Sequence, residues 1–239
     1  MINFKNKTIL ITGNGSFAHA MIEYLLKTDI KEIRIYSRNE EKQVETERKY
    51  NDNKLKFILG DIRDYKTLFK ALMGVDYCIH SGALKHVKKC EENPIEAKSI
   101  NIDGSENVIL ACINNNVEKL VCLSTDKASN ACTTYGTTKY MMERLIVGVD
   151  NKNTTITVTR YGNVAGSSGS VIPYFKQLAS EGKPLTLTDP NASSLFPYSI
   201  VEIKQQSTLV VNSLLHAITS FSLSSITYVK QVSVIGLSG

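Results

Sequence analysis

The sequence contains no tryptophan, and proline and cysteine are scarce, with five residues of each among 239. The cysteines are scattered at Cys78, Cys90, Cys112, Cys122 and Cys132. An odd number of cysteines without a Cys-x-x-Cys pair predicts neither a disulfide framework nor a structural zinc site, so we expect no metal. The first apolar run, residues 9–11, is far too short for a signal or membrane segment. We therefore expect a chain of a reducing, cytoplasmic compartment that does not enter a membrane.

The sequence also lacks a large excess of positive or negative charge. The sequence has 28 Lys and Arg residues against 23 Asp and Glu, a formal net charge of +5, and no long basic run. This balance argues against nucleic-acid binding and indicates at most a mild attraction to anionic small molecules. Because 42% of the residues are hydrophobic, the chain can bury one substantial core.

Short β-branched runs alternate with longer amphipathic stretches. We expect strands at residues 8–12, 33–37, 56–59, 76–80, 120–124 and 155–161, and helices at 17–28, 40–50, 65–73 and 134–149. Pro94 is typical of a first helical turn and predicts a helix that continues to about Asn114. The alternation predicts an α/β protein whose doubly wound parallel sheet carries helices on both faces.

The first predicted strand leads directly into a Gly-x-Gly-x-x-Ala turn at residues 13–18. Gly13 permits the tight turn, Gly15 allows the backbone to approach a pyrophosphate, and Ala18 allows close packing of helix and sheet. A glycine turn without a ligand is the alternative. A strand before the turn and a helix after it favour a dinucleotide-binding Rossmann fold, with Ser16 and Phe17 among the contacts.

The ends of the second and third strands bear on the choice of dinucleotide. Ser37 and Arg38 stand where an NAD-specific protein places an acid, and Arg38 suits the 2′-phosphate of NADP. The alternative is that Arg38 is a solvated surface residue. Asp61, in Gly-Asp-Ile-Arg-Asp at residues 60–64, could accept a hydrogen bond from the adenine amino group or could cap the next helix.

A candidate catalytic group follows the fifth strand. That strand ends in Ser-Thr-Asp-Lys at residues 124–127, and Tyr135 and Lys139 lie four residues apart on the next predicted helix, where they share one face. An ammonium beside a phenol favours the phenolate, which would lower the pKa of Tyr135. Such a pair occurs by chance in many helices, but here it follows a strand end in a chain that has a dinucleotide turn.

These segments, together with residues 83–87, Asn101 and residues 160–164, resemble the extended short-chain dehydrogenases. The closest resemblance is to the inverting UDP-N-acetylglucosamine 4,6-dehydratases of polysaccharide biosynthesis. The run at residues 124–127 discriminates best, because retaining dehydratases carry an acid where Lys127 stands, and epimerases usually lack the Asp as well. The resemblance implies an NADP-dependent hydro-lyase that acts on a UDP-sugar and forms a homo-oligomer.

The resemblance also implies a division of chemical roles. Tyr135, assisted by Thr125 and Lys139, would take the proton of the sugar's 4-hydroxyl while hydride leaves carbon 4. Lys127 would remove the hydrogen at carbon 5, and Asp126 would protonate the departing 6-hydroxyl. Hydride would return to carbon 6, and reprotonation from the opposite face would invert carbon 5. The division of acid and base roles between Asp126 and Lys127 stays open.

The expected site residues follow from the motif and the resemblance together. The expected coenzyme contacts are Gly13, Gly15, Ser16, Phe17, Ser37, Arg38, Asp61, Ile62, Ala83, Lys85, Asn101, Tyr135 and Lys139. The expected substrate contacts are Lys85, His86, Asn163, Ser170 and Val171. A histidine in a loop, as His86 is expected to be, is more often a satisfied polar residue than a ligand contact.

The sequence departs from the family pattern in its C-terminal part. Residues 192–196, Ala-Ser-Ser-Leu-Phe, replace a Met-Thr-Arg-Phe segment, and the chain stops earlier than a full-length member. We expect residues 1–190 to form the NADP-binding domain with the catalytic residues, and residues 191–239 to be a short irregular remnant of a substrate domain. A UDP-sugar 4-epimerase or reductase and a catalytically inactive dinucleotide-binding fragment are the alternatives.

Overall fold

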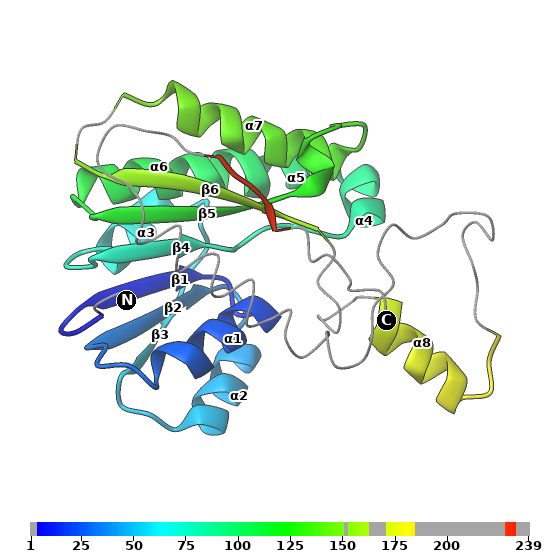
Figure 1. Ribbon diagram of the computed structural model, residues 1–239, viewed down its shortest axis with the longest axis horizontal. Coiled ribbons are helices and arrows are strands. Elements are labelled where there is room, and N and C mark those ends of the chain that lie inside the picture. The colour runs from blue at the N-terminus through cyan, green and yellow to red at the C-terminus, as the bar shows by residue number, and fades with distance from the viewer. Residues whose placement is uncertain (1–3, 151–152, 163–170, 185–227, 233–239) are drawn as a thin grey trace.

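The computed structural model describes residues 4–150, 153–162, 171–184 and 228–232. Their strands form one sheet in the order β3-β2-β1-β4-β5-β6-β7, and every neighbouring pair is parallel (Figure 1). The strands are β1 (Thr8–Thr12), β2 (Glu32–Ser37), β3 (Leu55–Leu59), β4 (Tyr77–His80), β5 (Lys119–Thr125), β6 (Thr155–Tyr161) and β7 (Tyr228–Val232). This arrangement confirms the predicted parallel sheet.

Helices cover both faces of the sheet (Figure 1). The α-helices are α1 (Ser16–Leu25), α2 (Glu40–Tyr50), α3 (Tyr65–Ala71), α4 (Val87–Glu92), α5 (Pro94–Lys98), α6 (Gly104–Asn114), α7 (Thr134–Gly148) and α8 (Val171–Ser180). A π-helical segment, η1 (Ser99–Asp103), joins α5 to α6, and one 3₁₀ turn, η2 (Asp126–Ala128), follows β5.

The alternation of side chains along β1 divides the core into two layers. Ile9 and Ile11 pack in one buried cluster with α1, whereas Leu10 packs in a second cluster with α3, α6 and α7. All five residues of β1 are buried, as expected for a parallel strand covered on both faces. Each fully buried aliphatic side chain contributes roughly 1.5–3 kcal/mol, so the two clusters hold the layers together.

The strand order reverses beside β1, which lies between β2 and β4. The connections that leave β1 and β4 therefore run to opposite faces of the sheet, and in open parallel sheets ligands bind at such a point, at the carboxyl ends of the strands. The glycine turn and the loop after β4 both begin at this edge.

Three elements differ from the sequence-based expectation. No element was expected at residues 87–92, where the structure has the short helix α4, and the helix that begins at Pro94 contains the π-helical segment η1. The C-terminal segment was expected to be irregular, but it supplies β7, which pairs with β6. The alternating β-branched pattern near residue 229 is compatible with a strand, yet its partner is about 70 residues away in the sequence.

None of the helices in the described part of the chain is long and apolar enough to cross a membrane. The cytoplasmic location stays a prediction.

Candidate coenzyme and catalytic site

The glycine turn after β1 has the geometry of a phosphate-binding turn. Gly13 has a φ of +91°, which favours glycine, and its N–H donates to the carbonyl of Tyr36 at 2.8 Å. Gly15 is the N-cap of α1, and a Cβ added there would meet no atom within 4 Å. Ala18, in the first turn of α1, is fully buried. The open space beside Gly15, at the start of a ten-residue helix, fits a pyrophosphate group.

Two lysines lie beside this turn. The Lys42 carbonyl accepts a hydrogen bond from Asn14 Nδ2 at 2.9 Å, which places the first turn of α2 against the glycine turn. Burial, and then the nearby ammonium of Lys42, lower the pKa of Lys85. Two ammonium groups of like charge favour a nearby anion. Lys85 was expected at the site, but Lys42 was not, because only the fold brings α2 next to the glycine turn.

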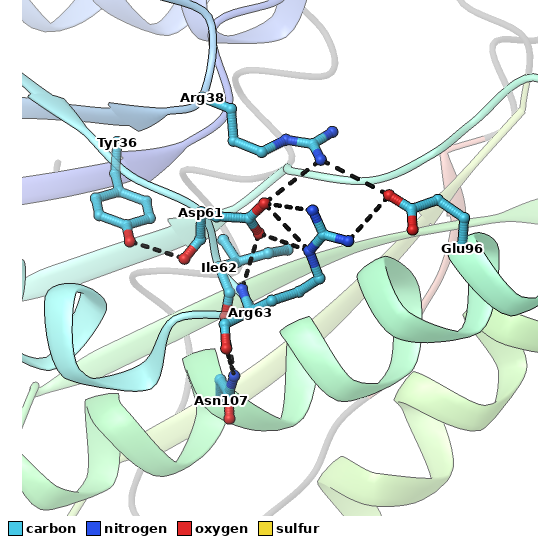
Figure 2. A network of polar contacts seen from close by, with 7 residues as sticks. All are labelled: Tyr36, Arg38, Asp61, Ile62, Arg63, Glu96 and Asn107. Carbon is cyan, nitrogen blue, oxygen red and sulfur yellow. Dashed lines mark hydrogen bonds and ion pairs between the residues drawn. The ribbon is translucent and has the colours of Figure 1, made fainter.

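Arg38 lies in a network of four charged residues at the ends of β2 and β3 (Figure 2). Its Nη1 is 3.4 Å from Asp61 Oδ2 and 4.0 Å from Glu96 Oε1. Arg63 contacts the same two carboxylates at 2.6 and 2.9 Å. Asp64, rather than Asp61, caps α3 by accepting hydrogen bonds from two backbone N–H groups. The capping alternative for Asp61 is therefore wrong.

Two of the predicted coenzyme residues have side chains engaged within the protein. Ile62 is 8% exposed and packs against α6, where a Cβ added to Gly104 would lie 2.7 Å from Ile62 Cδ1. The carbonyl and hydroxyl of Ser37 accept hydrogen bonds from Gln43 Nε2 at 3.0 and 2.9 Å. The side chain of Ile62 is thus part of the core, and coenzyme contacts of both residues stay predictions.

A buried chain of hydrogen bonds begins at the glycine turn. Thr12 Oγ1 accepts from the backbone N–H groups of residues 81 and 82, each at 3.1 Å, so its hydroxyl proton is left to donate to His80 Nδ1 at 2.8 Å. His80 Nε2 then carries the ring proton and donates to Ser105 Oγ at 2.9 Å. Ser105 donates to the carbonyl of Asn101 at 2.6 Å. The surroundings therefore select one neutral tautomer of His80.

The chain of hydrogen bonds continues through Asn101 to α7. Asn101 Oδ1 accepts from the Leu84 N–H at 2.8 Å, and Nδ2 donates to the Leu84 carbonyl and to Thr138 Oγ1 at 2.9 and 3.0 Å. Thr138 donates to the carbonyl of Tyr135 at 2.9 Å. Asn101 lies in η1, and π-helical turns are frequent at functional sites. The side chain of Asn101 holds the loop after β4 to α7, and its direct coenzyme contact stays a prediction.

The buried state of His80 leads to a prediction about stability. Burial is the main cause that lowers its pKa to about 3, and Lys139 adds to the effect. In the unfolded chain the pKa is about 6.5, so between pH 6.5 and 3 the unfolded state binds a proton that the folded state does not. This contribution to the free energy of unfolding is present above pH 6.5 and is lost as the pH falls through that window, by up to roughly 5 kcal/mol.

Urea unfolding of the whole chain at several pH values measures this contribution. We expect His80→Gln to flatten the decline of the unfolding free energy between pH 6.5 and 4. The control His86→Gln changes an exposed histidine and should keep the wild-type decline. If His80→Gln and wild type lose stability in parallel, His80 is not the group that titrates.

Thr125, Asp126 and Lys127 gather at the carboxyl end of β5. Thr125 Oγ1 donates to Asp126 Oδ1 at 2.9 Å, and Lys127 Nζ is 3.3 Å from the same oxygen. Thr125 Oγ1 also accepts from the backbone N–H of Lys127 at 3.3 Å. The structure thus brings a hydroxyl, a carboxylate and an ammonium together at the carboxyl edge of the sheet.

Helix α7 begins against this group. Its N-cap Thr133 accepts from the Gly136 N–H at 3.1 Å, and a Cβ added to Gly136 would lie 2.5 Å from the Lys127 carbonyl. The absence of a side chain at Gly136 therefore lets α7 approach η2. A hydrogen bond joins the phenol of Tyr135 to the hydroxyl of Thr125. This contact brings the predicted Thr125–Tyr135 pair together.

The protonation states differ from the sequence-based expectation. Burial is the largest cause that acts on Tyr135, and it raises the pKa of the phenol, while the hydrogen bond with Thr125 acts in the opposite direction. Lys139 is 3% exposed, and burial lowers its pKa to about 8. Its Nζ lies 3.2 Å from Met142 Sδ. In the chain alone, desolvation of the phenol outweighs any effect of Lys139, so the expected lowering of the Tyr135 pKa is wrong for this state.

A buried ion pair links α7 to β5 and β6. Glu143 of α7 is fully buried and accepts hydrogen bonds from Ser124 of β5 and from Arg160 of β6, the latter at 2.8 and 2.5 Å. Arg160 also donates to Ser129 Oγ at 3.0 Å. Removing one member of such a pair leaves an uncompensated buried charge. Sequence reasoning did not single out Glu143, because nothing local shows that it faces Arg160.

The predicted substrate residues are only partly described. His86 is exposed and is the N-cap residue of α4, and Lys85 precedes it. Val171 begins α8. Asn163 and Ser170 lie outside the described residues. The substrate contacts therefore stay predictions.

Comparison with known proteins places the chain in a family. Residues 9–223 match the family model described as polysaccharide biosynthesis protein. The chain belongs to this family. It is 46% identical over 208 residues to a protein of Rickettsia conorii named UDP-glucose 4-epimerase, and the match covers 83% of this chain. The chain spans 61% of the length of that relative.

Solved structures agree with the fold. Pen from Bacillus thuringiensis is 36% identical, with a TM-score of 0.81 over 90% of this chain and 66% of that chain. DesIV from Streptomyces venezuelae, a dTDP-glucose 4,6-dehydratase solved with NAD and TYD bound, is 18% identical, with a TM-score of 0.67 over 97% of this chain and 88% of that chain. At that identity the second likeness shows the fold alone, which is the Rossmann-like fold expected from the glycine turn.

Proposed function

We propose that the chain is a nucleotide-sugar 4,6-dehydratase that uses bound NADP and acts on UDP-N-acetylglucosamine or a close UDP-sugar. The observation that carries this proposal is the Asp126–Lys127 pair beside Thr125 and Tyr135. Dehydration needs a base for carbon 5 and an acid for the 6-hydroxyl in addition to the group that deprotonates the 4-hydroxyl. The pair supplies two further acid–base groups at the same strand end.

The first step is proton removal at the 4-hydroxyl. The dinucleotide, when bound, would accept a hydride from carbon 4 and later return one to carbon 6. Tyr135 takes the hydroxyl proton, and Thr125 holds its phenol by a hydrogen bond. Because burial raises the pKa of this phenol in the chain alone, a cation is needed near it to favour the phenolate. Lys139, four residues further along α7 and so on the same helical face, is the cation that we propose for this role.

The second step is elimination of water. A ketone at carbon 4 acidifies the hydrogen at carbon 5, which Lys127 removes in its neutral form. Asp126 protonates the departing 6-hydroxyl. Lys127 Nζ and Asp126 Oδ1 are 3.3 Å apart, so the proposed base and the proposed acid lie side by side. Return of the proton to carbon 5 from the opposite face completes the inversion.

A 4-epimerase is the second candidate function, and the printed names of the Rickettsia relatives favour it. Tyr135 and Lys139 would suffice for oxidation and reduction at carbon 4. The Asp126–Lys127 pair has no role in that reaction, which is why we place dehydration first. Binding of a dinucleotide without turnover is the third candidate.

One experiment separates the three candidates. The purified full chain is incubated with NADP and UDP-N-acetylglucosamine, and the nucleotide sugars are analysed by mass spectrometry and chromatography. A dehydratase produces a sugar that has lost water. An epimerase produces an isomer of unchanged mass, and a binding protein leaves the sugar unchanged, so either of these results rejects the dehydratase proposal.

The proposed preference for NADP rests on Arg38, whose side chain is 52% exposed at the end of β2. A carboxylate at this position would repel a 2′-phosphate and accept hydrogen bonds from a ribose instead. We expect Arg38→Asp to reverse the preference, with NADP binding weakened by about tenfold or more and NAD binding retained. Fluorescence titration with both dinucleotides measures the change. Equal or tighter binding of NAD by the unmodified chain would contradict this assignment of Arg38.

The expected homo-oligomer stays a prediction. The outer surface of α6 and α7 exposes Leu110, Met141 and Val147, and a shallow groove lies between the two helices. Light scattering of the purified chain measures the oligomeric state directly.

A further inference from the structure

We infer that Arg63 sets the coenzyme selectivity of this chain by holding two carboxylates away from Arg38. The inference rests on the proposed preference for NADP and deepens it. Arg63 was not among the expected coenzyme contacts, and we assign it a positioning role. Figure 2 shows the four side chains concerned, Arg38, Asp61, Arg63 and Glu96, on the loops after β2 and β3 and on α5.

Arg63 holds Asp61 from several directions. Its Nη2 is 2.6 Å from Asp61 Oδ2, its Nε donates to both carboxylate oxygens at 3.0 and 3.1 Å, and its backbone N–H donates to Oδ1 at 2.9 Å. Its Nη1 also donates to Glu96 Oε1 at 2.9 Å. A forked guanidinium can bind two carboxylates at once in this way. The charges of both acids are therefore already balanced mainly by Arg63.

Arg38 is the second and weaker partner of the same carboxylates. Its contacts with Asp61 and Glu96 are 3.4 and 4.0 Å long, whereas the shortest contacts of Arg63 with them are 2.6 and 2.9 Å. The Arg38 side chain is 52% exposed, compared with 33% for Arg63. Arg38 thus stays beside the network but keeps most of its donors directed to solvent, where a ligand can reach them.

A 2′-phosphate needs this arrangement for an electrostatic reason. It is an anion that binds best to a guanidinium with two free parallel donors and is repelled by uncompensated carboxylates nearby. Arg63 leaves the donors of Arg38 free for the phosphate, because Arg63 already binds the carboxylate oxygens that Arg38 would otherwise bind. Arg63 also reduces the repulsion of the phosphate, because its positive charge neutralises Asp61 and Glu96. NAD has no 2′-phosphate, so its affinity depends little on either effect.

Removing Arg63 should therefore redirect Arg38. Asp61 Oδ2 already lies within 3.4 Å of Arg38, so without Arg63 a small rotation would make a two-pronged pair between them. That pair would occupy the guanidinium N–H groups of Arg38 that the phosphate requires. Arg38 would still be present and charged, but it would be bound to Asp61 instead of the ligand.

The test measures the ratio of the dissociation constants for NADP and NAD by titration of the full chain. We expect Arg63→Ala to lower the NADP preference by roughly tenfold or more, with NAD binding nearly unchanged. Adding Asp61→Asn to Arg63→Ala should restore most of the preference, because an amide cannot capture Arg38 as a carboxylate does. Both dinucleotides contain adenine, so any lost contact between Asp61 and adenine cancels in the ratio.

Arg48→Ala is the matched control, since it removes an exposed arginine from the last turn of α2, and it should leave the ratio at the wild-type value. Arg63→Lys provides a second variant if Arg63→Ala does not fold. A single ammonium cannot hold both carboxylates, so its ratio should also fall, by less than that of Arg63→Ala. Retained binding of NAD shows that each variant is folded.

Two results would overturn the inference while leaving the NADP preference intact. One is an unchanged ratio in Arg63→Ala. The other is a lowered ratio that Asp61→Asn does not restore, which would mean that Arg63 attracts the phosphate by its own charge. If the wild-type chain itself shows no preference for NADP, the proposed coenzyme is wrong and the inference fails with it, and this outcome is visible before any variant is made.

Discussion

Replacing Tyr135 with phenylalanine should abolish water loss from the UDP-sugar, with a fall in turnover of about 10²–10⁴-fold. The variant keeps the ring but loses the hydroxyl that takes the proton of the 4-hydroxyl. It also loses the hydrogen bond to Thr125. Every later step depends on the ketone at carbon 4, so no partial reaction should remain. Mass spectrometry of the nucleotide sugars measures the loss, and circular dichroism verifies the fold.

Tyr140→Phe is the matched control, because Tyr140 is an exposed tyrosine of the same helix, 42% exposed. It should retain wild-type turnover. If Tyr135→Phe turns over as fast as Tyr140→Phe in an active preparation, another group removes the proton and the assignment of Tyr135 is wrong.

Replacing Lys127 with alanine should also stop water loss, with a comparable fall of about 10²–10⁴-fold, but at a different step. Tyr135 and Lys139 remain, so oxidation at carbon 4 can still occur. The base for carbon 5 is missing, so exchange of the carbon 5 hydrogen with solvent deuterium should collapse together with water loss. Mass spectrometry in deuterium oxide follows both quantities in one experiment.

Two comparisons sharpen this test. Lys66→Ala removes an exposed lysine from α3 and should leave exchange and turnover unchanged. Tyr135→Phe should lack exchange as well, because no ketone forms. If Lys127 were only a solvated lysine at a strand end, Lys127→Ala would show normal exchange of the carbon 5 hydrogen. Normal exchange in an active preparation would therefore refute the role of Lys127, while the role of Tyr135 would stand.

Much of the fold could be predicted from short segments of sequence. The buried strand at residues 8–12 and the glycine turn after it are local patterns, because side-chain periodicity and turn chemistry depend on neighbouring residues. The same is true of Pro94, which begins α5 as expected. The helix α4 and the strand β7 were missed, because a helix of six residues has a weak pattern and a terminal strand needs a distant partner.

The candidate site could be predicted only in part. The Ser-Thr-Asp-Lys run and the Tyr135–Lys139 spacing indicated which residues gather near one strand end. They did not indicate what surrounds those residues. Glu143 and His80, and the ion pair of Glu143 with Arg160, became visible only when α7, β6 and β4 were packed together.

By itself, the sequence determined the parallel sheet, the position of the glycine turn and the polar residues at the carboxyl ends of the strands, because each can be predicted from side-chain periodicity and turn chemistry within short segments of the chain. Only the tertiary structure decided the protonation states and the ion pairs. The pKa of Tyr135 is raised by burial, and Arg63 rather than Arg38 holds Asp61 most closely. Desolvation and Coulomb energy depend on distances in space, and the groups that set them come from strands and helices far apart in the sequence.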